Sequence, residues 1–366
     1  MQAPEALRLA EAGHRVVDVR EPFEWDAGHV AGATLIPLAD LPARLEEELP
    51  DRDAPLLLYC RTGARSGRAA LFLASRGYTS VVNLADRIDR WQALGGAWES
   101  GPEPLSAEQR RRYSRQLLMP EIGAQGQRRL LDASVLVVGA GGLGSPAALY
   151  LAAAGVGTIG LVDDDVVDES NLQRQVVHAT ERVGQPKTAS ARAALEALNS
   201  DVRVVEHHER MGPDNVERLI ADYGVVVDGS DSFETRYLLN DAAVRLKKPV
   251  VHASVYRWEG QVTTFIPFGG PCYRCLYPTE PPEGLAPDCS VAGVIGVLPG
   301  MAGMLQAGEV LKLLLGVGRT LAGRLLTIDS ATSEFTEVRV ARDPECPACG
   351  DAAAASLGAA RVPLAR

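Results

Sequence analysis

Short apolar runs alternate with amphipathic stretches along most of this chain. The runs Leu56–Tyr59, Ser134–Val138 and Gly224–Asp228 consist largely of aliphatic residues, which is typical of strands buried on both faces of a parallel sheet. The stretches after them have the apolar spacing of helices. Strands that alternate with helices predict an α/β fold.

The first of two regions is small. Strands are expected at 16–20, 56–59 and 80–84, with a helix from the loop after Tyr59 to about Arg76 that Gly77 ends. Residues 95–104 are rich in Gly and Pro, which marks a linker. We predict a first domain at 1–100 and a linker at 101–105.

The second region, 106–350, continues the alternation of strands and helices. A capping box at Ser106–Gln109 starts a helix, and a later helix spans 234–247. Strands are expected at 202–205, 224–228 and 249–253, followed by a buried helix at 301–315 and closing strands at 324–329 and 334–340. This pattern predicts a doubly wound parallel sheet. The Ala-rich end, 351–366, is expected to be a disordered tail.

A glycine-rich turn follows the strand Ser134–Val138. Such a turn lets bare N–H groups approach a phosphate, and the helix that begins near Ser145 adds its N-terminal partial charge. Asp163 ends the next strand, where an acid accepts hydrogen bonds from ribose hydroxyls. The expected nucleotide-binding glycines are Gly139, Gly141, Gly142 and Gly144.

Cys60 ends a strand in a loop that leads into a helix. The backbone N–H groups there, together with Arg61 and Arg65, favour a thiolate and can hold an anion. A buried structural cysteine is the alternative, and the polar and cationic neighbours argue against it.

Four further cysteines form two Cys-X-X-Cys pairs, which suit a structural tetrahedral zinc site. Two redox dithiols are the alternative, but neither pair follows the nucleotide turn or the Cys60 loop. The predicted zinc ligands are Cys272, Cys275, Cys346 and Cys349.

Composition excludes some classes of function. The 366 residues carry a net charge of −10 and have a pI of about 5.2, so the whole chain is not suited to bind nucleic acid or an anionic membrane. No charged-then-apolar leader opens the sequence and no apolar run is long enough to span a bilayer. We therefore expect a cytoplasmic protein.

The first region resembles the rhodanese family. The resemblance rests on Asp18–Arg20, Gly28–Ala33 and the six-residue loop Cys60, Arg61, Thr62, Gly63, Ala64 and Arg65. It implies that Cys60 accepts a sulfane sulfur and carries it as a persulfide, and that Arg65 anchors the loop. His29 is expected to support the fold rather than catalysis.

Residues 106–350 resemble the adenylyltransferases that activate ubiquitin-like sulfur carriers, relatives of ubiquitin-activating enzyme with a Rossmann-like fold. The matching motifs are Arg112–Gln116, Gly139–Gly144, Asn171–Gln175, Gly184–Lys187 and Asp228–Asp231. The resemblance implies that ATP is a substrate and that a sulfur carrier is the partner.

The chemistry of adenylation agrees with these motifs. A carboxylate must attack the α-phosphate of ATP, so the site needs cations and a metal held by acids. Lys187 and Arg174 supply positive charge, and Asp231 holds magnesium. Asn171 contacts the phosphates or orders its loop. In the family, Arg115 reaches into the nucleotide site of a partner subunit, so a homodimer is implied.

The remaining cysteine, Cys289, lies in a long Pro-rich loop that crosses over the acyl-adenylate in the family. Some members use a cysteine there for covalent sulfur transfer, so Cys289 is a candidate catalytic thiol. The family also has the arrangement of two cysteine pairs expected here for zinc.

The combined interpretation is adenylation of the C-terminal glycine of a sulfur carrier, with sulfur transfer from Cys60 to give a thiocarboxylate. Molybdopterin, thiamine and tRNA thiolation pathways fit, with a cysteine desulfurase or thiosulfate as sulfur donor. Known fusions place the rhodanese domain last, whereas here it comes first. Two alternatives stay open: an adenylyltransferase whose first domain only docks partners or senses sulfur, and an NAD-dependent oxidoreductase.

Overall fold

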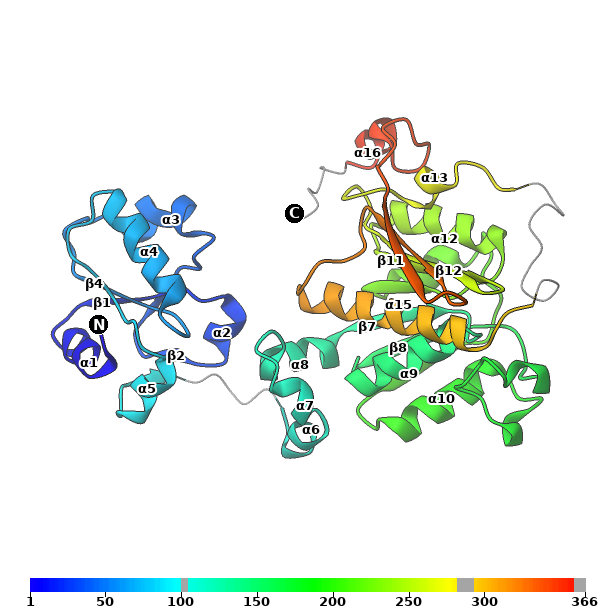
Figure 1. The fold of residues 1–366 in the computed structure, drawn as a ribbon, viewed down its shortest axis with the longest axis horizontal. Helices are drawn as coiled ribbons and strands as arrows, with labels where there is room; N and C mark the ends of the chain where they lie inside the picture. The colour runs from blue at the N-terminus through cyan, green and yellow to red at the C-terminus, as the bar shows by residue number, and fades with distance from the viewer. Residues whose placement is uncertain (100–104, 282–292, 359–366) are drawn as a thin grey trace. The chain divides into compact units, whose positions relative to one another are not determined.

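The structure is a computed structural model that describes residues 1–99, 105–281 and 293–358. The chain divides into two compact units, Met1–Arg128 and Arg129–Arg366 (Figure 1). The predicted limits at 100, 105 and 350 rest on the sequence and stay a prediction. Among the described residues, no helix is long and apolar enough to cross a bilayer.

The first unit contains a four-stranded parallel sheet in the order β3-β1-β4-β5, with the small antiparallel pair β2-β6 beside it. The strands are β1 Arg15–Asp18, β2 His29–Val30, β3 Thr34–Leu35, β4 Leu56–Tyr59, β5 Val81–Asn83 and β6 Trp98–Glu99. The helices are α1 Ala3–Glu11, α2 Pro22–Asp26, α3 Leu41–Glu48, α4 Ala64–Ser75, α5 Ile88–Ala93, α6 Ala107–Arg112, α7 Ser114–Leu117 and α8 Gly123–Asp132, which runs into the second unit.

Strand β4 explains why this sheet is covered on both faces. Leu56 and Leu58 pack with α3 and α4, whereas Leu57 and Tyr59 pack with α1 and α5. Successive side chains of a strand point to opposite faces, so an uninterrupted apolar run requires a helical layer on each side. The predicted small parallel α/β domain is confirmed.

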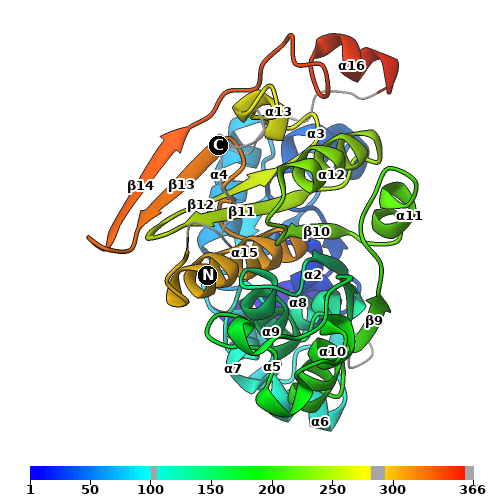
Figure 2. The ribbon, with the colours of Figure 1, turned by 90° about the vertical axis from the view of Figure 1, so that its right-hand side faces the viewer.

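The second unit is built on an eight-stranded sheet in the order β14-β13-β12-β11-β10-β7-β8-β9, of which Figure 2 shows β14, β13, β12 and β11 side by side. Its strands are β7 Ser134–Val138, β8 Thr158–Val162, β9 Arg203–His207, β10 Val225–Asp228, β11 Val250–Tyr256, β12 Glu259–Phe265, β13 Arg324–Asp329 and β14 Glu334–Arg339. Its helices are α9 Gly144–Ala154, α10 Lys187–Leu198, α11 Val216–Ala221, α12 Phe233–Arg245, α13 Tyr273–Leu276, α15 Val297–Leu315 and α16 Asp351–Ser356, with short 3-10 turns at Glu169–Asn171 and Thr180–Arg182.

Two apolar layers hold this sheet. Val135 and Val137 of β7 pack with α9, α10 and α15 on one face, whereas Leu136 and Val138 pack with α11 and α12 on the other. The doubly wound Rossmann-like arrangement is therefore confirmed for the central strands. It brings the carboxyl ends of β7, β8 and β10 to one edge, where such folds bind ligands.

The sheet is not parallel throughout, which corrects the prediction. Strands β11, β10, β7, β8 and β9 are parallel, but β12, β13 and β14 are added in antiparallel order. A tight turn at Arg257, with φ of 53°, joins β11 to β12. Strand β12 carries Gln and Thr between its apolar residues, so it lacks the continuous apolar run that marked the other strands.

The first part of the expected disordered tail is helical, and residues 359–366 lie outside the described residues. Residues Asp351–Ser356 form α16, whose Ala354 is buried against a cluster that contains Cys272, Cys346 and Cys349. Packing against this cluster stabilises the Ala-rich helix, which the composition of the segment alone does not predict.

Candidate functional site

The glycine turn after β7 makes backbone contacts that a side chain would prevent. Gly139 has φ of 87°, a conformation that favours glycine. A Cβ on Gly144 would lie 1.8 Å from the Gly139 carbonyl oxygen, and one on Gly139 would lie 2.9 Å from that of Gly229. The turn after β7 therefore lies directly against the loop after β10.

Two amides of this turn are left for a ligand. In the part of the chain that the structure describes, the N–H groups of Gly141 and Gly142 donate no hydrogen bond, and both residues line a pocket. Helix α9 begins at Gly144. Unpaired N–H groups at a helix N-terminus form an anion site.

Asp163 follows β8 and lies beside the turn. Its two carboxylate oxygens accept hydrogen bonds from the backbone N–H of Ala140, at 2.8 Å, and of Asp165, at 2.9 Å. Burial raises the pKa of Asp163, and the charge of Lys187 and the two N–H groups oppose that rise in part. Asp163 thus holds the turn and also lines the pocket, where its oxygens can accept hydrogen bonds from a ligand.

Lys187 is the first residue of α10 and is only 6% exposed. Its ammonium lies 2.7 Å from the exposed carboxylate of Asp165. Arg174 lines the same pocket and donates one hydrogen bond to the Ser170 carbonyl. Two cations thus lie near the unpaired amides.

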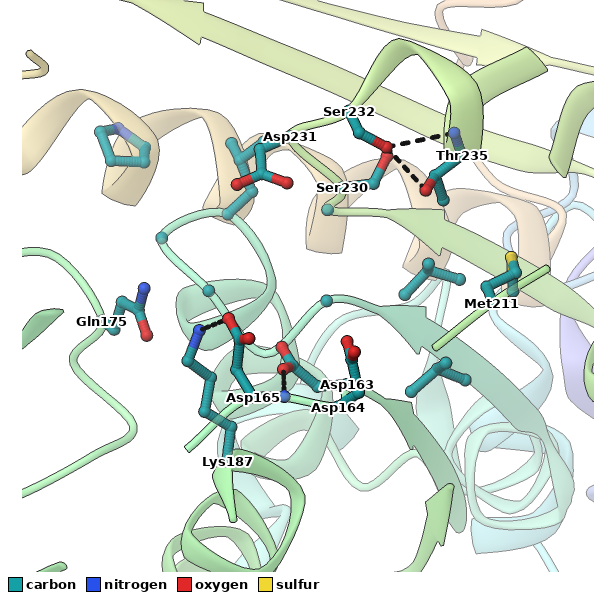
Figure 3. A pocket seen from close by; sticks show the side chains of 18 of the residues that line it. Asp163, Asp164, Asp165, Gln175, Lys187, Met211, Ser230, Asp231, Ser232 and Thr235 are labelled. Carbon is teal, nitrogen blue, oxygen red and sulfur yellow. Dashed lines mark hydrogen bonds and ion pairs between the residues drawn. The ribbon is translucent and has the colours of Figure 1, made fainter. Parts of the chain in front are cut away.

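The loop after β10 forms the facing wall. Asp228 is fully buried, and its carboxylate accepts hydrogen bonds from Ser230 and, at 2.7 Å, from His252 Nδ1. Burial raises the pKa of Asp228, but these hydrogen bonds outweigh it and the pKa is lowered. The loop is thereby held so that Asp231 points toward the pocket from the side opposite Asp163 and Lys187 (Figure 3).

These walls enclose a pocket of about 340 Å³. It is lined by seven of the predicted nucleotide residues: Gly139, Gly141, Gly142, Asp163, Arg174, Lys187 and Asp231. Gly144 packs behind the turn. Asn171 is outside the lining and instead caps its own loop through the Asp168 N–H, which agrees with the loop-ordering alternative.

Hard oxygen donors suited to magnesium stand on both walls. The carboxylates of Asp163, Asp164 and Asp165 have oxygens within 4.8 Å of one another, and Asp231 lies opposite. The donor set therefore fits the expected cation, with more acids than the one predicted from the sequence.

Sequence reasoning missed several pocket residues. Gln175 is buried and lines the pocket, and its side-chain oxygen has no hydrogen-bond partner among the residues that the structure describes. Arg236 also lines the pocket and donates to the Ser230 carbonyl. Gln175 belongs to the motif Asn171–Gln175, so its position was available as a signal, whereas nothing near Arg236 marked it.

In the first unit, Cys60 directly follows β4 and is 1% exposed. Burial alone would raise the pKa of Cys60. The Ser66 hydroxyl, whose Oγ lies 3.3 Å from Sγ, and the backbone N–H groups of Ser66, Thr62 and Arg65 outweigh burial, and the pKa is lowered. The loop therefore favours a thiolate, as its sequence suggested.

Arg65 makes a two-pronged ion pair with Glu24, at 2.6 and 2.8 Å. The pair joins the Cys60 loop to α2, which fits the anchoring role expected for Arg65. The His29 ring stacks on the Trp25 ring with centroids 3.4 Å apart, and its Nδ1 makes a hydrogen bond with the Trp25 backbone carbonyl. These contacts fit the supporting role expected for His29.

The four paired cysteines converge. Sγ of Cys272 lies 3.6 Å from that of Cys346 and 3.9 Å from that of Cys275, which lies 3.4 Å from Sγ of Cys349. Tetrahedral zinc with Zn–S bonds of about 2.3 Å has S···S edges of about 3.8 Å, whereas a disulfide needs about 2.0 Å. The cluster fits zinc without rearrangement.

The geometry of the pocket does not test the roles predicted for Cys289 and Arg115. Cys289 lies outside the residues that the structure describes. Arg115 is exposed on α7, in the first unit, and does not line the pocket.

Comparison with known families matches a different family model to each of the two regions. A model of the ThiF family matches residues 113–348, and a model of the rhodanese-like domain matches residues 2–94. The chain belongs to the ThiF family. It also carries a rhodanese-like domain at its N-terminal side.

Relatives of this ThiF chain include a SAMP-activating enzyme E1 from Haloferax volcanii, 52% identical over 69% of this chain and 93% of that protein. A sulfur carrier protein adenylyltransferase from Thermus thermophilus is 51% identical over 66% of this chain and 90% of that protein. The bovine adenylyltransferase and sulfurtransferase MOCS3 is 51% identical over 68% of this chain, but the match spans only 54% of that protein.

Solved structures share the fold. E. coli MccB, crystallised with MccA-N7isoASN, is 25% identical, with a TM-score of 0.59 over 65% of this chain and 75% of MccB. The same protein crystallised with ATP is 23% identical, with a TM-score of 0.58 over 69% of this chain and 77% of MccB.

Removal of one paired cysteine should release the metal. We expect Cys346→Ser to lower bound zinc from about one per chain to a trace, and to lower the Tm, because three thiolates hold zinc less tightly. Elemental analysis measures the zinc, and Cys60→Ser is the matched control. Equal zinc in Cys346→Ser and Cys60→Ser would refute the site.

Loss of the Ser66 hydroxyl should change the pH dependence of sulfur transfer. The hydroxyl stabilises the thiolate, so Ser66→Ala raises the pKa of Cys60 and moves the acid limb of the rate profile to higher pH. The rate of thiosulfate cyanolysis against pH measures this. Ser75→Ala, on the same helix, is the control, and a Ser66→Ala profile that coincides with it would contradict the prediction.

Proposed function

We propose that this protein adenylates the C-terminal glycine of a ubiquitin-like sulfur carrier with MgATP and converts it to a thiocarboxylate with sulfur held on Cys60. The observation that carries the proposal is the pocket of the second unit. It sets the unpaired amides of Gly141 and Gly142 between cations on one wall and Asp231 on the other. The names of the relatives support the same activity.

The first step joins two anions. A carboxylate oxygen of the carrier attacks the α-phosphorus of ATP, the bond to the bridging oxygen breaks, and pyrophosphate leaves with the electron pair. Lys187 and Arg174 neutralise charge on the phosphates, and Asp231 and the acids near Asp163 would hold magnesium. The metal would supply further positive charge at the leaving group.

The second step uses the mixed anhydride as an electrophile. The terminal sulfur of the Cys60 persulfide attacks the carbonyl carbon, AMP leaves, and the carrier becomes an acyl disulfide on Cys60. A thiolate then attacks Cys60 Sγ, which releases the thiocarboxylate and leaves a disulfide that a cellular thiol reduces. Cys289 is our candidate for this thiolate.

Other parts of the proposal rest on the family resemblance. They are a homodimer in which Arg115 completes the partner's nucleotide site, and a cysteine desulfurase or thiosulfate as sulfur donor. The relatives named MOCS3 favour the molybdopterin pathway, and thiamine biosynthesis and tRNA thiolation are the other routes to test.

The rival functions predict different chemistry. An NAD-dependent oxidoreductase would use the same glycine turn, but it gives no role to Lys187 and Asp231 together, and ThiF membership argues against it. A first domain that only docks partners would leave Cys60 dispensable, although the polar contacts around its sulfur favour a thiolate.

Replacement of Cys60 should uncouple the two steps. We expect Cys60→Ala to lower thiocarboxylate formation by at least about 100-fold, because no persulfide forms, while carrier adenylation is unchanged. The mass of the carrier C-terminus, read after incubation with MgATP, thiosulfate and a thiol reductant, measures the first quantity. Pyrophosphate release measures the second.

Unchanged thiocarboxylate formation in Cys60→Ala would contradict the relay and leave the docking role. Cys289→Ala tests the loop cysteine in a single turnover without added thiol, and full release of thiocarboxylate there would show that Cys289 is not the second thiol.

A further inference from the structure

One residue of the glycine turn, Ala140, is held through the peptide groups on both of its sides. The Ala140 N–H donates to Asp163 Oδ2 at 2.8 Å, and the Ala140 carbonyl accepts from His178 Nε2 at 3.0 Å and from Ser145 Oγ at 3.2 Å. His178 and Ser145 are both buried. The orientation of two successive peptide planes is therefore set by side chains behind the turn.

This orientation determines where an unpaired amide points. In a planar trans peptide, the C=O of one residue and the N–H of the next point in opposite directions. Since His178 and Ser145 hold the Ala140 carbonyl toward the interior, the Gly141 N–H must point away from them, and Gly141 lines the pocket. The Gly141 N–H, which can donate to an anion, is thus positioned by His178, whose side chain does not line the pocket.

The hydrogen bonds also determine which ring nitrogen of His178 carries the proton. A carbonyl oxygen only accepts, so Nε2 carries the proton and donates to Ala140. Nδ1 must then accept from the Ser190 hydroxyl, which lies 2.9 Å away. Burial lowers the pKa of His178 to about 4, so the ring stays neutral and keeps one donor and one acceptor.

Ser190 extends the connection to the cationic part of the site. It lies one turn into α10, the helix that begins with Lys187. The chain of bonds from Ala140 through His178 to Ser190 therefore joins the glycine turn to the helix that carries the buried lysine. A shift of the glycine turn relative to α10 would move the Gly141 N–H and the Lys187 ammonium apart.

We propose that His178 is a positioning residue for the phosphates of ATP, which acts through the Ala140 peptide and the start of α10. This inference rests on the proposed function, because it assumes that the anion held by Gly141 and Lys187 is part of ATP. Asp163, the expected ribose acceptor, keeps its hydrogen bond from the Asp165 N–H without His178, so we expect loss of His178 to affect phosphate binding far more than nucleoside binding.

The test compares ATP with adenosine on the full chain. His178→Phe removes both hydrogen bonds and keeps a flat ring, His178→Gln keeps a donor and an acceptor, and Ser190→Ala removes only the bond to Nδ1. His207→Phe is the control, since His207 bonds Tyr223 and lies outside the pocket lining. Dissociation constants are measured by calorimetry or competition, with circular dichroism to verify folding.

We expect His178→Phe to weaken ATP binding at least about tenfold and to leave adenosine binding within about twofold of wild type. His178→Gln should recover most of the ATP affinity. Ser190→Ala should lose less ATP affinity than His178→Phe and, like it, should keep its affinity for adenosine. His207→Phe should bind both ligands as the wild type does.

Two results would overturn the inference and leave the proposed function standing. One is unchanged ATP affinity in His178→Phe, and the other is an equal loss for ATP and adenosine, which would indicate a general structural role. If His178→Phe does not fold, His178→Gln and Ser190→Ala decide by the same comparison. A wild-type protein that binds ATP no better than adenosine would instead refute the proposed function.

Discussion

The nucleotide site depends on the close approach of two backbone segments at the carboxyl edge of one sheet. The turn after β7 and the loop after β10 touch through Gly139 and Gly229, with no side chain between them. This contact places the unpaired amides of Gly141 and Gly142 opposite Asp231. The parallel order of β7 and β10 brings the two segments together, so the site follows from the central part of the sheet.

Buried side chains turn this contact into a fixed geometry. Asp163 holds the N–H of Ala140 and His178 holds its carbonyl, and Asp228 with His252 holds the facing loop. The groups that would meet substrate lie on the parts that these contacts hold: Lys187 starts α10, which Ser190 links to His178, and Asp231 follows Ser230, which bonds Asp228. A preorganised arrangement of donors and charges is what stabilises charge that develops on a leaving group.

The sequence was sufficient for the parts that short, local patterns encode. The glycine turn, Asp163 at the end of a strand, the Cys60 loop and the four paired cysteines all lie where their motifs indicated. Strand β12 was missed because Gln261 and Thr263 interrupt its apolar pattern, and α16 because its stability comes from packing on the cysteine cluster. His178 was missed because its role depends on a contact with Ala140, a residue distant in sequence, which no spacing rule reveals. Gln175, in contrast, belongs to the motif Asn171–Gln175, which the sequence did mark.

The central claim is that this pocket couples a protein carboxylate to a nucleotide. Exchange of labelled pyrophosphate into ATP, measured with and without a ubiquitin-like sulfur carrier, tests it most directly. We expect exchange that requires both magnesium and a carrier with a free C-terminal glycine. Absence of exchange with every such carrier, together with reduction of NAD by the same protein, would contradict the claim.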